Sequence, residues 1–506
     1  MARILAVSGV VLAVGLVVGC SGGGGGGGTA TSGGTTCLSP TAKATDVLSS
    51  GTVSRAESLQ AASGAEASAL QPRLLLAVRT SRVALADVSQ ARLAAEKPLL
   101  TQVGVPRKIG LARDVAATAS VAATQAQLQW QATASGGQVA AISISTGQAK
   151  AVRLGVLVRS LPAQATLRIY AQGSTTAYTV QAQDVLDTLQ RNRDAGDSSD
   201  AARMYWTPVV DGAEATLEIE LPAAVSTAGV EIAIPRLSHL FMTPLADGTN
   251  VAKAAGSCEV DAVCNTSYTS ESNSVARMSF VEDGASFVCT GTLLNDTRGS
   301  GIPYFLGANH CISTQAAAST LQTWWFYRAT SCGSGVMNAG ARSLPGGATL
   351  LYQSETTDTS FMRLLGTPPA GAVFAGWSVN PATVGAVAAS VHHPDGDLQK
   401  VSTGSITSFL SCTLLSASTL NFSCTNSTQA GGNFINAKFT SGATEEGSSG
   451  APLFETVGTG HYLVGQLYGG NSSCSNLSGS NAYGRFDVAY TAALSRWLTA
   501  AAGTCP

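Results

Sequence analysis

The stretch TEEGSSGAPLF, Thr444–Phe454, decides how the chain is interpreted, because it places two serines between glycines. Gly447 and Gly450 flank Ser448 and Ser449, and such a loop can turn sharply enough to direct two backbone N–H groups at one point. This arrangement suits a serine nucleophile with its oxyanion hole. The same composition is common in ordinary turns, and the chain has 55 glycines, so the stretch alone does not establish catalysis.

A serine nucleophile needs a base and an acid that orients the base, and the chain contains only five histidines. His310 stands out because it follows the apolar run IPYFLGA and directly precedes Cys311. A disulfide from Cys311, for example to Cys289, would fix the position of His310. Asp358 comes next, before the alternating run TSFMRL, although an aspartate there also suits a turn cap. The order His310, Asp358, Ser449 is the chymotrypsin order and differs from that of subtilisins and α/β-hydrolases. The remaining histidines are interpreted as core, surface, strand-end or turn residues: His239, His392, His393 and His461.

The first twenty residues, MARILAVSGVVLAVGLVVGC, have the pattern of an export signal. Their apolar run, Ile4–Val18, is too short to span a membrane comfortably. It ends in Val-Val-Gly before Cys20, which resembles a bacterial lipobox, although an ordinary signal peptide with a chance cysteine has the same pattern. We expect residues 1–19 to be removed, Cys20 to carry lipid, and residues 20–37 to tether the chain to the outer membrane or the cell surface.

The composition indicates an exported, β-rich protein with two or three domains. Charged residues make up 12% of the 506 residues and the formal net charge is −2, which gives no sign of nucleic-acid binding. Nine of the 11 cysteines follow residue 250. Together with an export signal, and without CxxC pairs and a matching histidine pair, they predict disulfides, with no metal site and no cofactor.

Residues 38–250 predict a β-rich domain, because short alternating runs begin at about Val139 at the spacing of a β-sandwich. Within this domain, residues 47–63 suggest a short helix and residues 191–202 a solvated loop. The small, polar stretch Phe241–Ser257 suggests a domain boundary.

Lys253, in that boundary, has the surroundings of an exposed cleavage site. Residues 256–506 then show short strands and many turns. Their last segment has apolar residues at helical spacing, which predicts a C-terminal helix that packs Trp497 and Leu498 inward.

Several motifs resemble the lysyl endopeptidase branch of the chymotrypsin-like serine proteases: CTGTLLND, PYFLGANHC, DTSFMRL, GSSGAPLF and LVGQLYGG, with the shorter CEVDAVC, FAGW, VHHP and SSCS followed by AYGRF. They run in order from Cys258 to about Phe486 and cover most of residues 256–500. The resemblance implies an all-β fold: a chymotrypsin-like double β-barrel with a C-terminal helix, preceded by a β-sandwich-like pro-domain that assists folding or masks the cleft. The alternative is that residues 38–250 are an accessory binding module that stays attached.

The resemblance also implies roles for single residues. His310 is the base, Asp358 orients it, Ser449 is the nucleophile, and the N–H groups of Gly447 and Ser449 form the oxyanion hole. It implies the disulfides Cys258–Cys474, Cys264–Cys332 and Cys289–Cys311. Cys412 and Cys424 remain as a local bridge, and Cys37 and Cys505 are left over by elimination.

Three positions depart from the family pattern. Ser448 stands where the trypsin branch has an aspartate that receives the new amino terminus. Asn481 takes the place of the aspartate that selects lysine, and Tyr468, next to Gly469, takes the place of a histidine. We assign Tyr468, Gly469 and Asn481 to substrate binding and predict that the preference for lysine is lost. A carboxylate supplied by Glu445 or Glu446 would overturn that prediction.

The leading hypothesis is therefore a monomeric, lipid-anchored serine endopeptidase acting on proteins or peptides. One alternative is a catalytically weak or inactive surface adhesion or binding protein on a protease-like scaffold, as the change at Asn481 suggests. Another is an esterase with the same triad, although the strand VGQLYGG suits pairing with an extended peptide.

Overall fold

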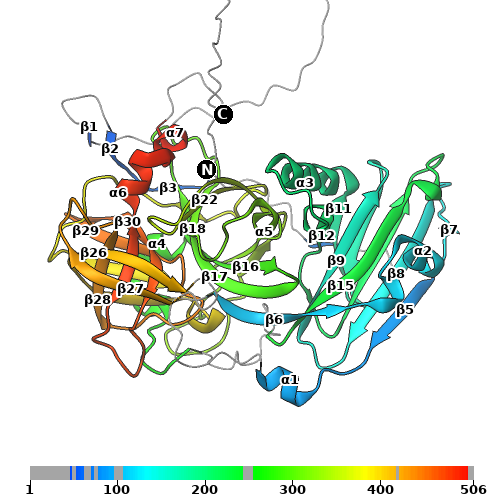
Figure 1. Ribbon diagram of the computed structural model, residues 1–506, viewed down its shortest axis with the longest axis horizontal. Helices are drawn as coiled ribbons and strands as arrows, with labels where there is room; N and C mark the ends of the chain where they lie inside the picture. The colour runs from blue at the N-terminus through cyan, green and yellow to red at the C-terminus, as the bar shows by residue number, and fades with distance from the viewer. Residues whose placement is uncertain are drawn as a thin grey trace, which may run out of the picture. The chain divides into compact units, whose positions relative to one another are not determined.

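The computed structural model describes residues 46–47, 53–61, 70–72, 78–95, 106–242, 255–416 and 421–499. All of them belong to one unit, Ser39–Pro506, in which strands predominate (Figure 1). Cys20, the tether, Cys37, Lys253 and Cys505 lie outside the described residues, so the expectations about them stay predictions.

The first half of the C-terminal region is a sheet of seven strands in the order β20-β19-β16-β17-β18-β22-β21. Its inward side chains form one apolar core that includes Met278, Phe305, Trp325 and Met362. The strands are β16 (Val275–Glu282), β17 (Ala285–Leu294), β18 (Tyr304–Ala308), β19 (Gln322–Trp325), β20 (Arg342–Leu344), β21 (Ala348–Ser354) and β22 (Thr359–Leu364).

The second half closes on itself, because β30 pairs with both β29 and β31 and completes the ring β30-β29-β25-β26-β28-β31. This is a six-stranded barrel around a core that includes Ile406, Phe439, Leu453 and Tyr483. Its strands are β25 (Val387–His392), β26 (Lys400–Ser416), β28 (Phe434–Ser441), β29 (Pro452–Val457), β30 (Gly460–Gly470) and β31 (Asn481–Arg485); β27 (Asn421–Ser427) pairs with β26, and β24 (Trp377–Ser378) with β30.

The predicted C-terminal helix is present as α6 (Phe486–Ala489), a π-helical segment η7 (Tyr490–Leu494) and α7 (Ser495–Leu498). Leu498 is fully buried, and the ring of Trp497 lies 5.7 Å from that of Phe361 in the first sheet. Phe486 likewise contacts Trp377 of β24. The helix therefore packs across both halves and helps to fix them to each other.

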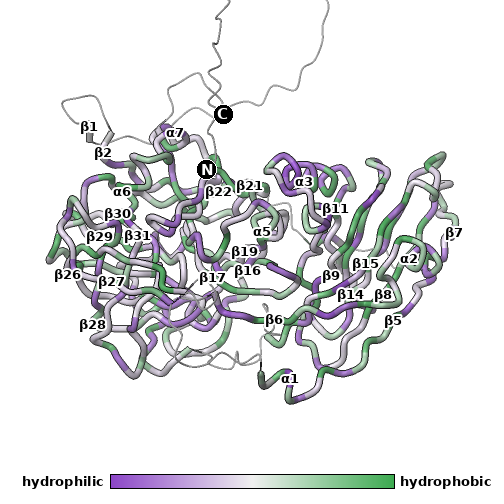
Figure 2. Tube along the Cα trace, viewed as in Figure 1, coloured by the Kyte–Doolittle hydropathy of each residue, from purple (hydrophilic) through white to green (hydrophobic). Residues whose placement is uncertain are grey.

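The N-terminal domain, residues 78–242, has two sheets that share one apolar core, as a sandwich requires. Figure 2 shows hydrophobic stretches along its long strands, whereas α3 (Ala182–Asp194) is mostly hydrophilic. One sheet contains β5 (Thr80–Leu85), β7 (Gln131–Ala132), β8 (Gln138–Thr146), β10 (Thr166–Tyr170), β11 (Thr176–Gln181) and β14 (Glu214–Leu221), with β4 (Leu70–Pro72) at its edge; the other contains β6 (Arg107–Asp114), β9 (Ala151–Ser160), β12 (Met204–Trp206), β13 (Val210–Asp211) and β15 (Glu231–Leu240). The N-terminal domain also has the short helices α1 (Gln90–Ala95) and α2 (Val121–Gln127), and the protease region has α4 (Thr269–Ser272) and α5 (Gln315–Ala318).

The second sheet does not stop at the domain boundary. Strand β6 pairs antiparallel with β17, so the order β12-β9-β15-β6-β17-β16 runs from one domain into the other. Ile109 of β6 is fully buried in a cluster with Val288 and Trp324 of the C-terminal region. The sequence predicted a β-sandwich, and the two sheets of the N-terminal domain form one. The second sheet also continues into the protease domain, because β6 covers an edge of β17.

Two local predictions were wrong. Residues 47–63 contain strands rather than a helix: β1 (Asp46–Val47), β2 (Val53–Ala56) and β3 (Leu59–Gln60). β2 pairs with β24, and β3 pairs with β23 (Val373–Phe374), so residues 53–61, here called the arm, extend along the C-terminal region. Residues 191–202 are not all loop, because α3 continues to Asp194.

Candidate active site

His310 and Asp358 come together because the strands that carry them are partners. β18 ends at Ala308 and β22 begins at Thr359, and these two residues face each other in the antiparallel ladder. The Asp358 carboxylate lies 2.8 Å from His310 Nδ1 and also accepts the backbone N–H of His310 at 2.9 Å. An ionised carboxylate accepts, so Nδ1 carries the proton and Nε2 is left with the lone pair of a base.

Asp358 has a positive φ of 50°, an unfavourable conformation that neighbouring groups must hold. Its carbonyl oxygen accepts the N–H of Asn309 at 2.9 Å and the side-chain amide of Gln466 at 3.2 Å. Gln466 lies on β30, so the second barrel supports the turn at Asp358. No motif in the sequence indicated this role for Gln466. The Cys289–Cys311 disulfide, next to His310, ties the same turn to β17.

Ser449 lies in a loop whose conformation requires glycine at two places. Gly447 and Gly450 have φ values of 86° and 80°, and a Cβ on Gly450 would come within 2.4 Å of the Thr290 carbonyl oxygen. The Ser449 carbonyl accepts the N–H of Thr290 at 2.8 Å, and the Thr290 hydroxyl donates to the Gly447 carbonyl at 2.9 Å. Within the described chain, the N–H groups of Gly447 and Ser449 have no hydrogen-bond acceptor, as an oxyanion hole requires.

The two atoms that would react are both buried and both unpaired. Ser449 is 1% exposed and the side chain of His310 4%. Neither Ser449 Oγ nor His310 Nε2 has a hydrogen-bond partner in the parts of the chain that the structure describes. Such a pair can still act, because catalytic hydrogen bonds often tighten only when substrate binds.

His392 and His393, in the motif VHHP, bond to Ser448 of the serine loop and to Thr290 beside it. From the sequence, both histidines were interpreted as surface or strand-end residues. His392 does end β25, but it is fully buried, as is His393. The ring of His392 lies 2.9 Å from the hydroxyls of Ser448 and Ser402, and burial lowers the pKa of His392 to about 3. A neutral imidazole thus holds Ser448 at the position that carries an aspartate in the trypsin branch.

The predicted substrate-binding residues lie at the end of β30 and the start of β31. Asn481 is fully buried; its carbonyl accepts from Thr444, and its amide donates to the Ala437 carbonyl at 3.2 Å. Tyr468 stacks on Phe422 at 4.1 Å, and its ring lies 5.8 Å from that of His310. Gly469 pairs with Ala482 in the adjoining ladder.

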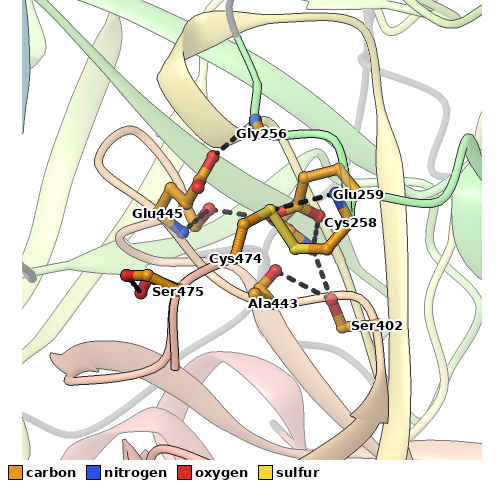
Figure 3. Close-up of a disulfide and its surroundings, with 11 residues drawn as sticks. Gly256, Cys258, Glu259, Ser402, Ala443, Glu445, Cys474 and Ser475 are labelled. Carbon is orange, nitrogen blue, oxygen red and sulfur yellow. Dashed lines mark hydrogen bonds and ion pairs between the residues drawn. A yellow bond between two sulfur atoms is a disulfide. The ribbon is translucent and has the colours of Figure 1, made fainter. Parts of the chain in front are cut away.

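The two glutamates that could overturn the specificity prediction are engaged elsewhere. Glu445 accepts the N–H of Gly256 at 3.0 Å, beside the Cys258–Cys474 disulfide, and Figure 3 shows its carboxylate directed at Gly256. Glu446 pairs with Arg107 of β6 at 2.7 Å. In the uncut chain, each carboxylate therefore has a partner other than a substrate side chain.

The structure forms four disulfides, which are the pairs expected from the resemblance and from the local spacing: Cys258–Cys474, Cys264–Cys332, Cys289–Cys311 and Cys412–Cys424. Cys258, Cys474 and Glu259 approach one another, but sulfurs joined in a disulfide are not available as thiolate ligands. None of the helices described has both the length and the apolar composition needed to cross a membrane.

The closed barrel and its partner sheet, together with the matches to protease families, define a double-barrel serine protease, an enzyme that hydrolyses peptide bonds. Residues 81–241 match the family model of the lysyl endopeptidase N-terminal domain, and residues 252–485 match that of the C-terminal domain. The chain is 32% identical over 417 residues to a lysyl endopeptidase of Pseudomonas aeruginosa, covering 79% of this chain and 82% of that protein. It belongs to the lysyl endopeptidase family.

Likenesses to solved structures are more distant. The thermostable serine protease AL20 from an extremophilic microorganism is 15% identical with a TM-score of 0.31, covering 46% of this chain and 100% of that one. The HtrA-type protease AlgW with a tripeptide is 16% identical with a TM-score of 0.30, covering 46% and 62%.

Proposed function

We propose that this protein is an endopeptidase in which Ser449 is the nucleophile, His310 the base and Asp358 the group that orients it. The supporting observation is the His310–Asp358 pair, which directs the protonated Nδ1 at the carboxylate and leaves Nε2 free. Ser449 Oγ attacks the peptide carbonyl and gives its proton to Nε2, while the N–H groups of Gly447 and Ser449 bind the oxyanion. The imidazolium then protonates the leaving amine, and water hydrolyses the acyl-enzyme.

Asp358 accepts the Nδ1–H throughout and stabilises the imidazolium. Its two contacts to His310 support this role, because they fix both the tautomer and the position of the ring. The same geometry would also serve an esterase. A peptide is the better substrate because relatives with this architecture are endopeptidases.

We also propose that the enzyme does not select lysine at P1, the residue before the scissile bond. A basic side chain entering a dry pocket loses water and needs a carboxylate to replace it. Asn481 carries no charge, and its two polar groups already bond to Thr444 and Ala437. Small or neutral P1 residues are therefore favoured.

A fluorophosphonate probe tests the catalytic proposal. The chain, cut between its two domains and kept until the two fragments have separated, should be labelled once, at Ser449. Ser449→Ala should lose the label, whereas Ser478→Ala, a change at an exposed serine, should keep it. A wild-type chain that does not react would favour the adhesion or binding scaffold instead, and labelling that persists in Ser449→Ala would exclude Ser449 as the nucleophile.

For localisation, the four disulfides and the family suggest export. We propose further that lipid on Cys20 holds the protein at the envelope and that residues 38–250 act as a propeptide. Incorporation of labelled fatty acid into the wild type but not into Cys20→Ser would support the anchor. Equal incorporation, or none, would rule it out.

A further inference from the structure

One edge of β17 runs past the proposed nucleophile and has three partners in succession. β16 occupies the opposite edge along the whole strand. The edge away from β16 has the three partners. β18 pairs with Thr292–Leu294, the Ser449 carbonyl accepts the N–H of Thr290, and β6 pairs with Ser286–Val288. Strand β6 of the N-terminal domain lies beside β17 (Figure 1). It occupies the same edge as the loop of Ser449, a few residues further along β17.

An extended peptide substrate commonly binds by adding a strand to an exposed edge. The edge of β17 at residues 286–288 would be bare without β6. The proposed P1 pocket belongs to the second barrel, with Asn481 and the end of β30. The β17 edge, in the first sheet, is thus left for the residues that follow the scissile bond.

The side chain that β6 brings to this place is basic. Arg107 faces Val288 in the ladder, and its guanidinium lies 2.7 Å from Glu446 and 3.4 Å from Asp395. The two carboxylates come from separate loops, which are joined by a hydrogen bond from the N–H of Asp395 to the carbonyl of Glu446. Glu446 directly precedes Gly447, so this acidic pair adjoins the proposed oxyanion hole.

The acidic pair needs a cation. The side chains of Asp395 and Glu446 are only 23% and 10% exposed, and burial raises the pKa of both carboxyl groups while Arg107 opposes the rise. In the described part of the chain, Arg107 is the one basic side chain that forms an ion pair with either of them. That partner is supplied by the N-terminal domain rather than by the protease domain itself.

We propose that Asp395 and Glu446 form a subsite for an arginine or lysine side chain on the leaving-group side of a peptide substrate. Strand β6 fills this subsite with Arg107 in the uncut chain. The N-terminal domain then blocks the cleft as a bound peptide would, by strand pairing and one basic side chain. This inference rests on the proposed peptidase function and adds a substrate preference to it.

Internally quenched peptides test the subsite directly. The cut chain, once its two fragments have separated, should be assayed with peptides that carry Arg, Gln or Glu at each of the first three positions after the scissile bond. At one position we expect kcat/KM to be about tenfold higher for Arg than for Gln, the size of a hydrogen-bonded charge pair. Glu446→Gln and Asp395→Asn should reduce that ratio toward one. Glu282→Gln, which removes an exposed carboxylate at the end of β16, should leave the ratio unchanged.

A competition experiment avoids dependence on the folding of variants. A synthetic peptide with the sequence of residues 106–114, PRKIGLARD, should inhibit the cut chain. The same peptide with Arg107→Gln should inhibit about tenfold less strongly. Equal inhibition by the two peptides, or equal kcat/KM for Arg and Gln at every position, would overturn the subsite. Because the fluorophosphonate probe is applied first, a chain that labels at Ser449 but shows no basic preference refutes only this inference.

Discussion

The base side of the active site and the serine side differ in where their supports come from. His310 and Asp358 are held by paired strands, a disulfide and Gln466, all within the protease domain. The loop of Ser449 rests on Thr290 and buried histidines, but its residue Glu446 is bonded to Arg107 of the other domain. The supports of the His310–Asp358 pair thus lie in the protease domain alone, whereas the serine loop has one contact, Glu446 to Arg107, that depends on the N-terminal domain.

The sharpest test of this comparison removes the base side. His310→Ala or Asp358→Asn should lower kcat by about 10⁴ or more, because base and nucleophile act as one unit and an amide would favour the wrong tautomer. Both variants should retain the wild-type circular dichroism. Active-site-titrated rates with a quenched peptide would measure the loss. A decrease of less than about tenfold in His310→Ala would refute the proposed base.

A second test concerns the specificity of the serine side. Asn481→Asp should increase kcat/KM for a lysine P1 residue relative to a neutral one by about 10², since a carboxylate then replaces the lost solvation of the ammonium group. Asn380→Asp adds the same charge at an exposed position and should not change the ratio. Profiling with a P1-varied library supplies the measurement. Strong selection for lysine by the wild type would show that a carboxylate already reaches the pocket.

A third test asks how far the serine loop depends on β17. Thr290→Val removes the hydroxyl that donates to Gly447 and accepts the N–H of His393. We expect kcat to decrease roughly 10- to 100-fold, with a small change in KM, because the oxyanion donors lose their position. Thr292→Val is the matched control, since that hydroxyl is buried on the same strand and has no hydrogen-bond partner among the described residues. Equal effects of the two substitutions would argue against a positioning role for Thr290.

The smallest expected effect is a dependence of stability on pH. Burial raises the pKa of Asp395 from 3.8 to about 6; Arg107 lowers it, and the negative charges of Glu445, Glu446 and Asp397 raise it. A raised carboxyl pKa favours the protonated fold, so this contribution is complete below pH 3.8 and is lost as pH rises through 6. Between pH 4 and pH 7 the free energy of unfolding of the wild type should decrease by about 1–2 kcal/mol relative to that of Asp395→Asn, after allowing for the partial exposure of the side chain. Urea unfolding at several pH values measures the difference, and a constant difference would contradict the raised pKa.

The order of motifs was enough to predict the double barrel, the four disulfides, and the residues that the structure brings together as the His310–Asp358 pair. These features depend on short segments with strong local patterns, such as a glycine-flanked serine. What the sequence did not indicate depends on long-range contacts. Arg107 meets Glu446 across 339 residues, and the burial of His392 depends on the two strands that pair with β25, which no local pattern specifies.

The misread helix at residues 47–63 has the same cause. Its apolar residues satisfy a helical spacing, yet isolated short helices are marginal without tertiary packing. The free edges of β23 and β24 offer backbone hydrogen bonds to an extended segment, and residues 53–61 adopt that conformation. Tertiary context therefore decided between two locally acceptable structures.

The arm is a second contact between the N-terminal part of the chain and the protease domain, in addition to the pairing of β6 with β17. Ala56 is 1% exposed in the core beneath β24, and Glu57 accepts hydrogen bonds from Asn295 and from Tyr462. A cut between residues 242 and 255 would leave two fragments joined at two separate places, the arm and β6. When one contact opens, the other holds the two separated surfaces at a high effective concentration, so the open contact forms again before the fragments diffuse apart. Cleavage and separation are then different events, and the lifetime of the nicked complex, rather than the rate of cutting, sets how soon the cleft becomes free.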